Sequence, residues 1–212
     1  MAEMNTKAMQ KISYGLFVCT ASKDGRANGC IINTAMQAAS DPNCITIAVN
    51  KANYTHDIIM ETKQCNISVI DKEACFDLFR LFGFSSGRDT DKFAVLPGTS
   101  FRIAANGIPY ITEHTNAYFS LRVTDTADLG SHTLFICEPT AMEVLSDVPS
   151  CTYEHYHKEI KPKPQAVGKT DSGKTIWRCT ICGFEWEGDE LPDDFICPIC
   201  KHPKADFEKV QV

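Results

Sequence analysis

The sequence predicts a mainly-β chain of two domains, a larger one followed by a small metal-binding one. Apolar runs of strand length alternate with turn residues through most of the first 150 positions. Near the C-terminus, two Cys-x-x-Cys pairs stand fourteen residues apart in a short, aromatic-rich segment. With 212 residues and 43% hydrophobic content, the chain can build one ordinary core and a small appendage.

Three consecutive strands are expected at the start of the chain. Residues 16–20 are apolar, and the segment 22–26 after them contains Asp-Gly, the signature of a tight hairpin turn. Residues 28–39 are predicted as the second strand, which ends at Asp41 and Pro42. A third strand follows over 44–49, and turns this short predict an antiparallel sheet or barrel.

A short helix is expected after the third strand. Thr55 suits its N-cap position, and Asp57 suits its first turn, where an acidic side chain complements the helix dipole. Ile58, Ile59 and Thr62 share one face of this helix and are predicted to point into the core.

The later elements alternate in the same way. A strand is predicted over 65–70, then a helix over 74–82 that ends at Gly83, with a polar loop after it. Further strands are predicted over 117–124, 132–138 and 141–145, with Pro139 separating the last two.

Residues 151–175 are predicted to form a linker. Lys-Pro-Lys-Pro favours an extended backbone there, and Gly, Ser and Asp favour turns. The chain then divides into a first domain over 1–150, the linker over 151–175 and a second domain over 176–212. When extended, such a linker spans up to roughly 75 Å, so the second domain can reach its own first domain or that of a partner subunit.

Charge and leader signals limit the function classes. The net charge of −6 argues against nucleic acid as a partner, because phosphate binding needs clustered Lys and Arg. From residue 176 onward there are eight acidic and four basic residues, which predicts a basic surface on any partner of this domain. The N-terminal segment lacks the apolar run of a signal peptide, and no stretch is long enough to cross a membrane. We therefore expect a cytoplasmic protein with reduced thiols, in which most of the other seven cysteines are small buried hydrophobes.

The four clustered cysteines form a candidate metal centre. Each Cys-x-x-Cys pair places two sulfurs on one tight turn, and two facing turns supply a tetrahedral site. The predicted ligands are Cys179, Cys182, Cys197 and Cys200. Spacing alone permits structural zinc as well as iron.

The context of these cysteines is more specific than their spacing. Around them stand Trp177, Cys-Gly-Phe at 182–184, Trp186, Phe195, Cys-Pro-Ile-Cys at 197–200 and Pro-Lys…Phe at 203–207. This context resembles rubredoxin, the one-iron electron carrier, and implies an iron held by four thiolates and shielded by aromatic side chains. Lys201 departs from the pattern, because rubredoxins usually have glycine there; a positive φ would cost a lysine roughly 1 kcal/mol.

Four stretches of the first domain also form a pattern. They are NGCIINTAMQAASDP, VNKANYTHD, FGFSSGRDTDKF and GSHTLFICEP. In this order they resemble the flavin reductase family, the FMN-binding split barrels. The resemblance implies a split β-barrel that binds NAD(P)H directly over the flavin, usually as a homodimer with the cofactor near the interface. The lack of a G-x-G-x-x-G dinucleotide fingerprint is consistent with that mode of binding.

The same resemblance implies a flavin site on these stretches. Residues expected along the polar edge of the isoalloxazine ring are Cys30, Ile31, Asn33, Thr34 and Gln37. Residues expected near the flavin phosphate, at the start of a helix, are Asn50, Lys51, Asn53, Thr55 and His56. Phe82 is expected to pack on the ring, and Arg88 and Lys92 to add positive charge. His132 is the predicted catalytic residue, which would hold the nicotinamide or stabilise charge on the reduced flavin.

Each of these residues also has a plain structural role available. Thr34 can satisfy buried backbone groups, Thr55 can act only as a helix cap, and His132 can be a hydrogen-bonded sheet histidine. Nothing in the sequence marks Cys30 as reactive. The four stretches in order, rather than any one residue, therefore carry the flavin interpretation.

A flavin reductase domain followed by rubredoxin is the arrangement of the high-molecular-weight rubredoxins, which pass electrons from NADH to flavodiiron proteins. The expected function is thus electron transfer from NAD(P)H through FMN to a one-iron centre and on to an acceptor such as a flavodiiron oxygen or nitric oxide reductase. Two other classes stay open: a free-flavin reductase with a zinc-ribbon docking module, and a flavin carrier without catalytic activity of its own. NADH or NADPH, FMN or FAD, and transfer within or between subunits are open as well.

Overall fold

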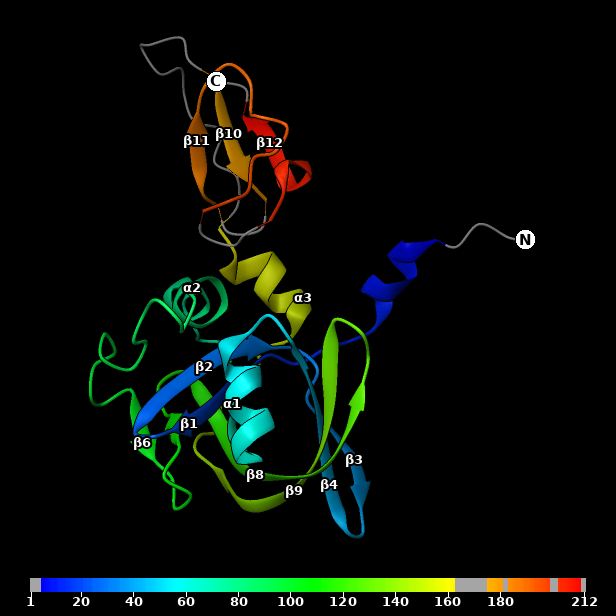
Figure 1. Cartoon of the computed structure of the whole chain (residues 1–212), viewed down its shortest axis with the longest axis vertical. Helices are drawn as coiled ribbons and strands as arrows, with labels where there is room; N and C mark the ends of the chain where they lie inside the picture. The colour runs from blue at the N-terminus through cyan, green and yellow to red at the C-terminus, as the bar shows by residue number, and fades with distance from the viewer. Residues whose placement is uncertain (1–4, 163–174, 181–182, 199–201, 211–212) are drawn as a thin grey trace.

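The computed structural model describes residues 5–162, 175–180, 183–198 and 202–210. It contains a large antiparallel sheet with flanking helices and, above them in Figure 1, a small three-stranded sheet near the C-terminus. The mainly-β prediction is confirmed. No helix in the described ranges is long and apolar enough to cross a lipid bilayer.

Seven strands make the large sheet, in the order β2-β1-β5-β8-β9-β4-β3, and neighbouring strands are antiparallel. They are β1 (Phe17–Lys23), β2 (Arg26–Ile32), β3 (Met36–Ser40), β4 (Asn43–Asn50), β5 (Gln64–Ile70), β8 (Thr115–Asp128) and β9 (His132–Val144). Because β2 and β3 stand at opposite ends of this order, the chain must cross between them at residues 33–35. The prediction of a single strand over 28–39 is therefore wrong.

One turn and one proline in this sheet show how far local sequence directs the strands. Asp24 and Gly25 have φ angles of 51° and 77°, the left-handed values that a tight hairpin turn requires, so the predicted turn between β1 and β2 is present. Pro139 does not end a strand as predicted. It lies inside β9 opposite Leu121, where the pairing register with β8 shifts, and a proline is tolerated at such an irregularity.

The expected first helix is present as α1 (Tyr54–Thr62), but with a different cap. Its N-cap residue is Asn53, whereas Thr55 is fully buried and its Oγ1 accepts a hydrogen bond of 2.9 Å from Asn28 Nδ2. The cap prediction for Thr55 is thus wrong, because a tertiary partner uses its hydroxyl. Ile58 and Ile59 are buried as predicted.

The second helix, α2 (Phe76–Phe84), runs one residue beyond Gly83, where it was predicted to end. Its buried face carries Leu78, Phe79 and Phe82. A short hairpin of β6 (Phe101–Ile103) and β7 (Pro109–Ile111), which the sequence did not predict, follows the loop after α2.

Two apolar clusters form the interior of the large domain. One lies against the sheet beneath α1 and contains Ile47, Ile67 and Phe135. The other lies between the sheet and α2 and contains Val18, Phe79, Phe82 and Ile111, together with Tyr156 from the C-terminal end of the domain.

Part of the predicted linker is helical. Residues α3 (Tyr153–His155) and η2 (Tyr156–Ile160) form consecutive turns, and the Thr152 side chain accepts a hydrogen bond from the His155 amide at their start. Tyr156 is buried with its ring centroid 4.4 Å from that of Phe79 on α2. This apolar ring holds residues 153–160 on the first domain, which the polar composition of the segment did not predict.

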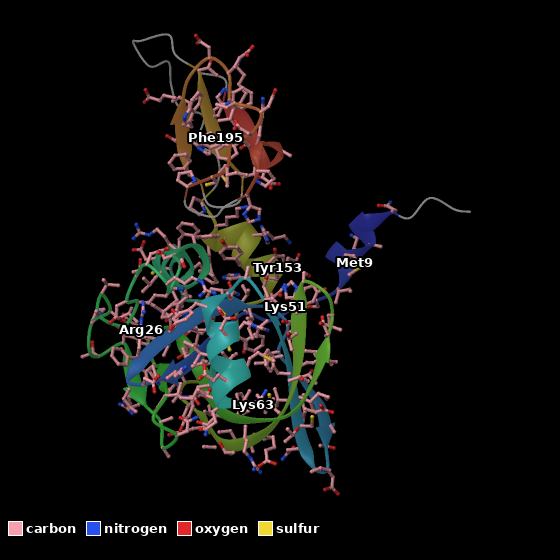
Figure 2. All side chains as sticks on the ribbon, in the orientation of Figure 1. Met9, Arg26, Lys51, Lys63, Tyr153 and Phe195 are labelled. Carbon is pink, nitrogen blue, oxygen red and sulfur yellow. The ribbon has the colours of Figure 1, made fainter. Side chains whose placement is uncertain are left out.

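The small sheet has the order β11-β10-β12, with β10 (Ile176–Cys179), β11 (Glu185–Glu187) and β12 (Phe207–Val210). The one-turn helix η3 (Lys204–Asp206) precedes β12, and η1 (Thr6–Lys11) lies near the N-terminus. Phe195 lies in the small domain, and Tyr153 lies below it at the start of α3 (Figure 2).

Candidate functional site

A cleft of about 1400 Å³ opens beside β2, where the turn before α1, the helix α2 and the loop after α2 meet. The first residues of α1 and the end of α2 both contribute to its walls. Its volume exceeds the roughly 300–1,000 Å³ of most small-molecule sites, so it can hold more than one ligand.

The structure brings most of the predicted flavin residues together at this cleft. Those that line it are Cys30, Ile31, Asn50, Asn53, Thr55, Phe82, Lys92 and His132. They come from β2, β4, α1, α2, the loop after α2 and β9, elements that are distant in sequence. The tertiary fold is therefore what makes them neighbours.

Six predicted site residues lie outside the cleft walls. They are Asn33, Thr34, Gln37, Lys51, His56 and Arg88. The Thr34 hydroxyl donates to the Ala48 carbonyl at 2.7 Å and accepts from the Ala48 amide at 3.3 Å, which ties the β2–β3 connection to β4. Gln37 lines a separate cavity of about 430 Å³ on another part of the sheet.

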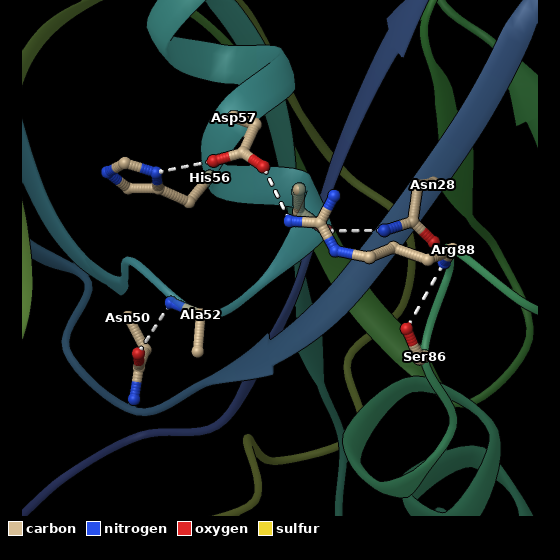
Figure 3. Close-up of polar contacts among 8 residues, drawn as sticks. Asn28, Asn50, Ala52, His56, Asp57, Ser86 and Arg88 are labelled. Atoms are coloured by element: carbon tan, nitrogen blue, oxygen red, sulfur yellow. Dashed lines mark hydrogen bonds and ion pairs between the residues drawn. The ribbon is translucent and has the colours of Figure 1, made fainter.

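The three charged or titratable residues of this group have partners within the protein, and Figure 3 shows those of His56 and Arg88. His56 Nε2 lies 2.8 Å from Thr133 Oγ1, and its Nδ1 lies 3.3 Å from Asp57. The other Asp57 oxygen accepts a hydrogen bond of 2.6 Å from Arg88, which holds the pKa of that carboxyl below its usual value despite opposing desolvation. Lys51 pairs with Asp128 at 2.7 Å on the surface.

Lys92 is the buried cation of the cleft. It is 2% exposed, and its Nζ donates to the Gly29 carbonyl at 2.7 Å and the Phe82 carbonyl at 3.3 Å. Burial lowers its pKa to about 8. An ammonium group has three hydrogens, so these two carbonyls leave one hydrogen without an acceptor among them.

Asn28 is a site residue that the sequence reasoning missed. It is 3% exposed and lines the cleft, and its Oδ1 has no hydrogen-bond partner among the described residues. Gly87 lies directly against it, since a Cβ at that position would overlap the Asn28 amide. Leaving a buried acceptor unpaired costs about 1–3 kcal/mol, so this oxygen calls for a donor from a ligand. The signal in the sequence was an asparagine inside an otherwise apolar strand.

These features fit a flavin. The Lys92 ammonium suits an anionic group, Asn28 Oδ1 suits an N–H or hydroxyl donor, and the Phe82 ring supplies an apolar contact. Gly29 is required for this wall, because a Cβ there would lie 2.9 Å from the Phe82 ring.

His132 lies at one end of β9, paired in register with Asn50 of β4, and both residues line the cleft. Its Nδ1 is 2.9 Å from Ser131 Oγ, which leaves Nε2 as the ring nitrogen for a ligand. Asn50 Oδ1 accepts a hydrogen bond of 2.9 Å from the Ala52 amide, which shapes the turn that leads into α1 (Figure 3).

The candidate metal centre is built on the small sheet. Cys179 ends β10 and Cys197 follows the Ile196–Pro203 bridge; both are buried in one cluster with Leu191 and Phe207. Phe195 packs edge-on against Phe207 with ring centroids 5.3 Å apart, so aromatic rings exclude water around the two sulfurs.

Backbone bonds shape the two cysteine turns. The Gly183 amide donates to the Cys179 carbonyl at 2.9 Å, with the glycine at φ 81°, and the Cys197 amide donates to the His202 carbonyl at 2.8 Å. Cys182, Cys200 and Lys201 lie outside the described residues, and the described ones alone assemble no group of three metal ligands. Two buried cysteines in one apolar cluster fit half of a tetrathiolate site.

Comparison with known proteins finds a relative for each of the two domains and for their combination in one chain. The model of the flavin reductase like domain matches residues 9–163, and that of the rubrerythrin, rubredoxin-like domain matches residues 177–208. A high molecular weight rubredoxin from Moorella thermoacetica is 36% identical over 98% of this chain and 100% of its own length. The chain belongs to the high-molecular-weight rubredoxins.

Other relatives match the first domain. A ferric-chelate reductase (NAD(P)H) from Archaeoglobus fulgidus is 34% identical over 82% of this chain and 98% of its own length. Among solved structures, a Streptomyces globisporus NADH:FAD oxidoreductase aligns with a TM-score of 0.63 at 17% identity, covering 71% of this chain and 92% of its own. An FMN-binding protein from Thermus thermophilus aligns with a TM-score of 0.59 at 19% identity, covering 68% and 77%.

These findings confirm two predictions. The fold is a flavin reductase-like barrel domain followed by a small rubredoxin-like domain, and the protein is a flavin oxidoreductase.

Proposed function

We propose that this protein transfers electrons from NAD(P)H through FMN to a one-iron rubredoxin centre and on to an external acceptor. The observation that carries the proposal is the pairing of two sites in one chain. One is a cleft with a buried lysine and an unsatisfied buried acceptor, and the other is a pair of buried cysteines in one apolar cluster. A flavin supplies the chemistry that joins them, because it accepts two electrons as hydride and returns them singly.

Different residues of the cleft are proposed to bind the FMN and the nicotinamide. We propose that Lys92 neutralises negative charge on the FMN and that the Asn28 carbonyl oxygen accepts a hydrogen bond from it. Thr55, whose hydroxyl already accepts from Asn28 Nδ2, holds that amide in place. His132 stands apart from Lys92 at an end of β9, where its Nε2 is proposed to orient the nicotinamide.

Three relatives support the choice of donor and cofactor. The Archaeoglobus reductase is named for NAD(P)H, the Streptomyces structure for NADH and FAD, and the Thermus structure for FMN. A cleft of about 1400 Å³ also leaves room for a nicotinamide beside a flavin.

The proposed external acceptor is a flavodiiron protein with a basic docking surface. The eight acidic and four basic residues from position 176 onward would complement such a surface. A cytoplasmic location, proposed from the sequence, accompanies this partner.

We also propose a homodimer. Met36 on β3 is 65% exposed, and Met142 and Val144 on β9 are 59% and 73% exposed, with β4 between the two strands. Met36 and Met142 border the apolar cavity of about 430 Å³ that contains Gln37. Exposed apolar groups clustered around a cavity are typical of an interface.

Anaerobic stopped-flow spectroscopy tests the electron path. NADH is expected to bleach the flavin first and the ferric-thiolate absorption next, within one turnover. Cys197→Ser should remove the iron and spare flavin reduction, because the two sites share no ligand. Ferric absorption that persists long after flavin reduction would contradict the proposal.

Metal analysis of the same sample separates the main alternative. A colourless, zinc-loaded protein that still oxidises NADH would identify a free-flavin reductase with a zinc-bound module. Bound flavin and iron without NADH oxidation would identify a carrier that another protein reduces.

A further inference from the structure

Resting on the proposed function, we propose that the rubredoxin domain docks on the end of α2 in its own subunit, seated on Phe84. In this position Pro198 and His202 of the small domain border the flavin cleft, and iron is reduced within one chain. The reaction balances as one electron leaving the reduced flavin for each Fe(III) that becomes Fe(II).

The contact at Phe84, called the seat below, is the first observation that supports this arrangement. It is the last residue of α2, and its half-buried side chain packs against the apolar cluster of the small domain that contains Cys179 and Cys197. Its ring also lies 5.9 Å from that of Phe76 on the same helix, which limits its freedom before the domain arrives. A residue of the first domain thus completes the core around the metal centre.

The cleft is the second contact. Pro198 and His202 of the small domain line it together with Phe82, Lys92 and His132 of the first domain. Pro198 directly follows the ligand Cys197, and the His202 carbonyl accepts a hydrogen bond from the Cys197 amide. The residues that frame the second cysteine turn therefore border the space in which the flavin is proposed to bind.

Chain connection favours docking within one subunit. Residues 153–160 are held on the first domain through Tyr156, so the connection to the small domain begins after Ile160 rather than at residue 151. The fifteen residues from 161 to 175 span at most roughly 50 Å. This limit shortens the reach toward a partner subunit and leaves the domain's own cleft well within range.

The docked position has a direct consequence for catalysis. Because Pro198 and His202 border the cleft but are not among the residues proposed to hold the flavin, docking sets how close the metal centre lies to the flavin and leaves the flavin contacts themselves unchanged. Substitutions at the seat are therefore expected to change iron reduction more than flavin binding.

Three variants test the seat. Phe84→Asp places a charge in an apolar contact, Phe84→Leu keeps an apolar side chain there, and Ile103→Asp is the control. Ile103 is 60% exposed and ends β6, a strand that Figure 1 shows far from the small domain. The first readout needs no electron transfer: NMR relaxation of the backbone amides in the zinc-loaded full chain reports whether the two domains tumble together.

We expect joint tumbling in the parent chain, Phe84→Leu and Ile103→Asp, and faster, separate tumbling of residues 176–210 in Phe84→Asp. Joint tumbling in Phe84→Asp would overturn the seat. If that variant does not fold, separate tumbling of the small domain in the parent chain would overturn it instead.

The second readout is the rate of iron reduction after rapid mixing with NADH, measured against the rate of flavin reduction in each variant. The parent rate is expected to be independent of protein concentration, and Phe84→Asp should lower it about tenfold relative to flavin reduction, with most of the rate retained in Phe84→Leu. A parent rate proportional to protein concentration would overturn docking within one chain. Iron that stays oxidised in the parent chain would contradict the proposed function, while the tumbling readout would still report the docking.

Discussion

Lys92 shows how a single residue can couple ligand binding to pH. Its ammonium group is buried between two carbonyl oxygens, and burial lowers its pKa to about 8 from about 10.5 in the unfolded chain. The unfolded state therefore binds more protons between these values, and stability of the ligand-free protein rises as pH increases through that window. Below pH 8 the Lys92 side chain is mostly charged and can pair with an anionic ligand.

FMN affinity is expected to fall as pH rises above about 8. The anionic cofactor binds the charged form of Lys92 better than the neutral form, so by pH 9 the dissociation constant should be about tenfold larger than at pH 7. Lys92→Met should weaken binding at pH 7 and flatten the pH profile. Calorimetric titration of the ligand-free chain with FMN measures both effects, with the exposed Lys72→Met as control. An unchanged profile in Lys92→Met would show that Lys92 does not face the cofactor.

Residue-scale expectations succeeded where side-chain chemistry is local. The aromatic and glycine context of the cysteines indicated buried sulfurs, and Cys179, Cys197 and Phe207 lie in one cluster. Asn28 was missed because its importance depends on a buried oxygen without a partner, which only packing reveals. Thr55 was taken for a cap because its sequence position could not show that Asn28 would reach its hydroxyl.

At the scale of elements, the contact between β2 and α2 decides the width of the cleft. Gly29 of β2 lies so close to the Phe82 ring of α2 that no side chain fits between them. The carbonyl of the same glycine accepts the hydrogen bond of Lys92. One small residue thus positions both an aromatic ring and a cation.

Gly29→Ala is expected to destabilise the ligand-free protein by about 1–3 kcal/mol, because the added methyl group would lie 2.9 Å from a fully buried ring. Urea unfolding followed by circular dichroism measures the change. Gly98→Ala is the matched control, since a Cβ there meets no atom within 4 Å. Equal midpoints for the two variants would show that α2 moves away at little cost.

Element boundaries followed the sequence where turn chemistry is strong and departed from it where tertiary contacts intervene. Asp24 and Gly25 form the predicted hairpin turn. Pro139 continues a strand because the register shift in β8 removes the need for its missing N–H. Residues 153–160 are helical because Tyr156 packs on Phe79, a contact that a polar, proline-containing segment did not indicate.

On the scale of the whole molecule, residues of the first domain and of the metal-binding domain, which are far apart in the sequence, border one cleft. Pro198 and His202 of the small domain line the cleft with Lys92 and His132 of the large one. Exposed methionines on another part of the sheet leave a second surface for assembly. The proposed dimer and the proposed docking thus use different parts of the protein.

Met142→Asp is expected to weaken the homodimer, because it places a charge at the edge of an apolar cavity where Met142 is 59% exposed. Analytical ultracentrifugation over a range of protein concentrations would show a larger monomer fraction than in the parent chain. Leu129→Asp, 55% exposed in the β8–β9 turn and outside that cavity, is the control. A monomeric parent chain, or equal dissociation of both variants, would contradict the assignment of this interface.

The sequence by itself determined the family, the two-domain organisation and the candidate ligands of both sites, because motif chemistry and strand signals are carried by neighbouring residues. Only the tertiary structure decided which flavin-site residues share a cleft, that Asn28 joins them, and that Phe84 meets the rubredoxin core. The physical reason is that burial and proximity depend on how distant segments pack, so an unpaired oxygen, a desolvated lysine and a contact between domains exist only in the folded chain.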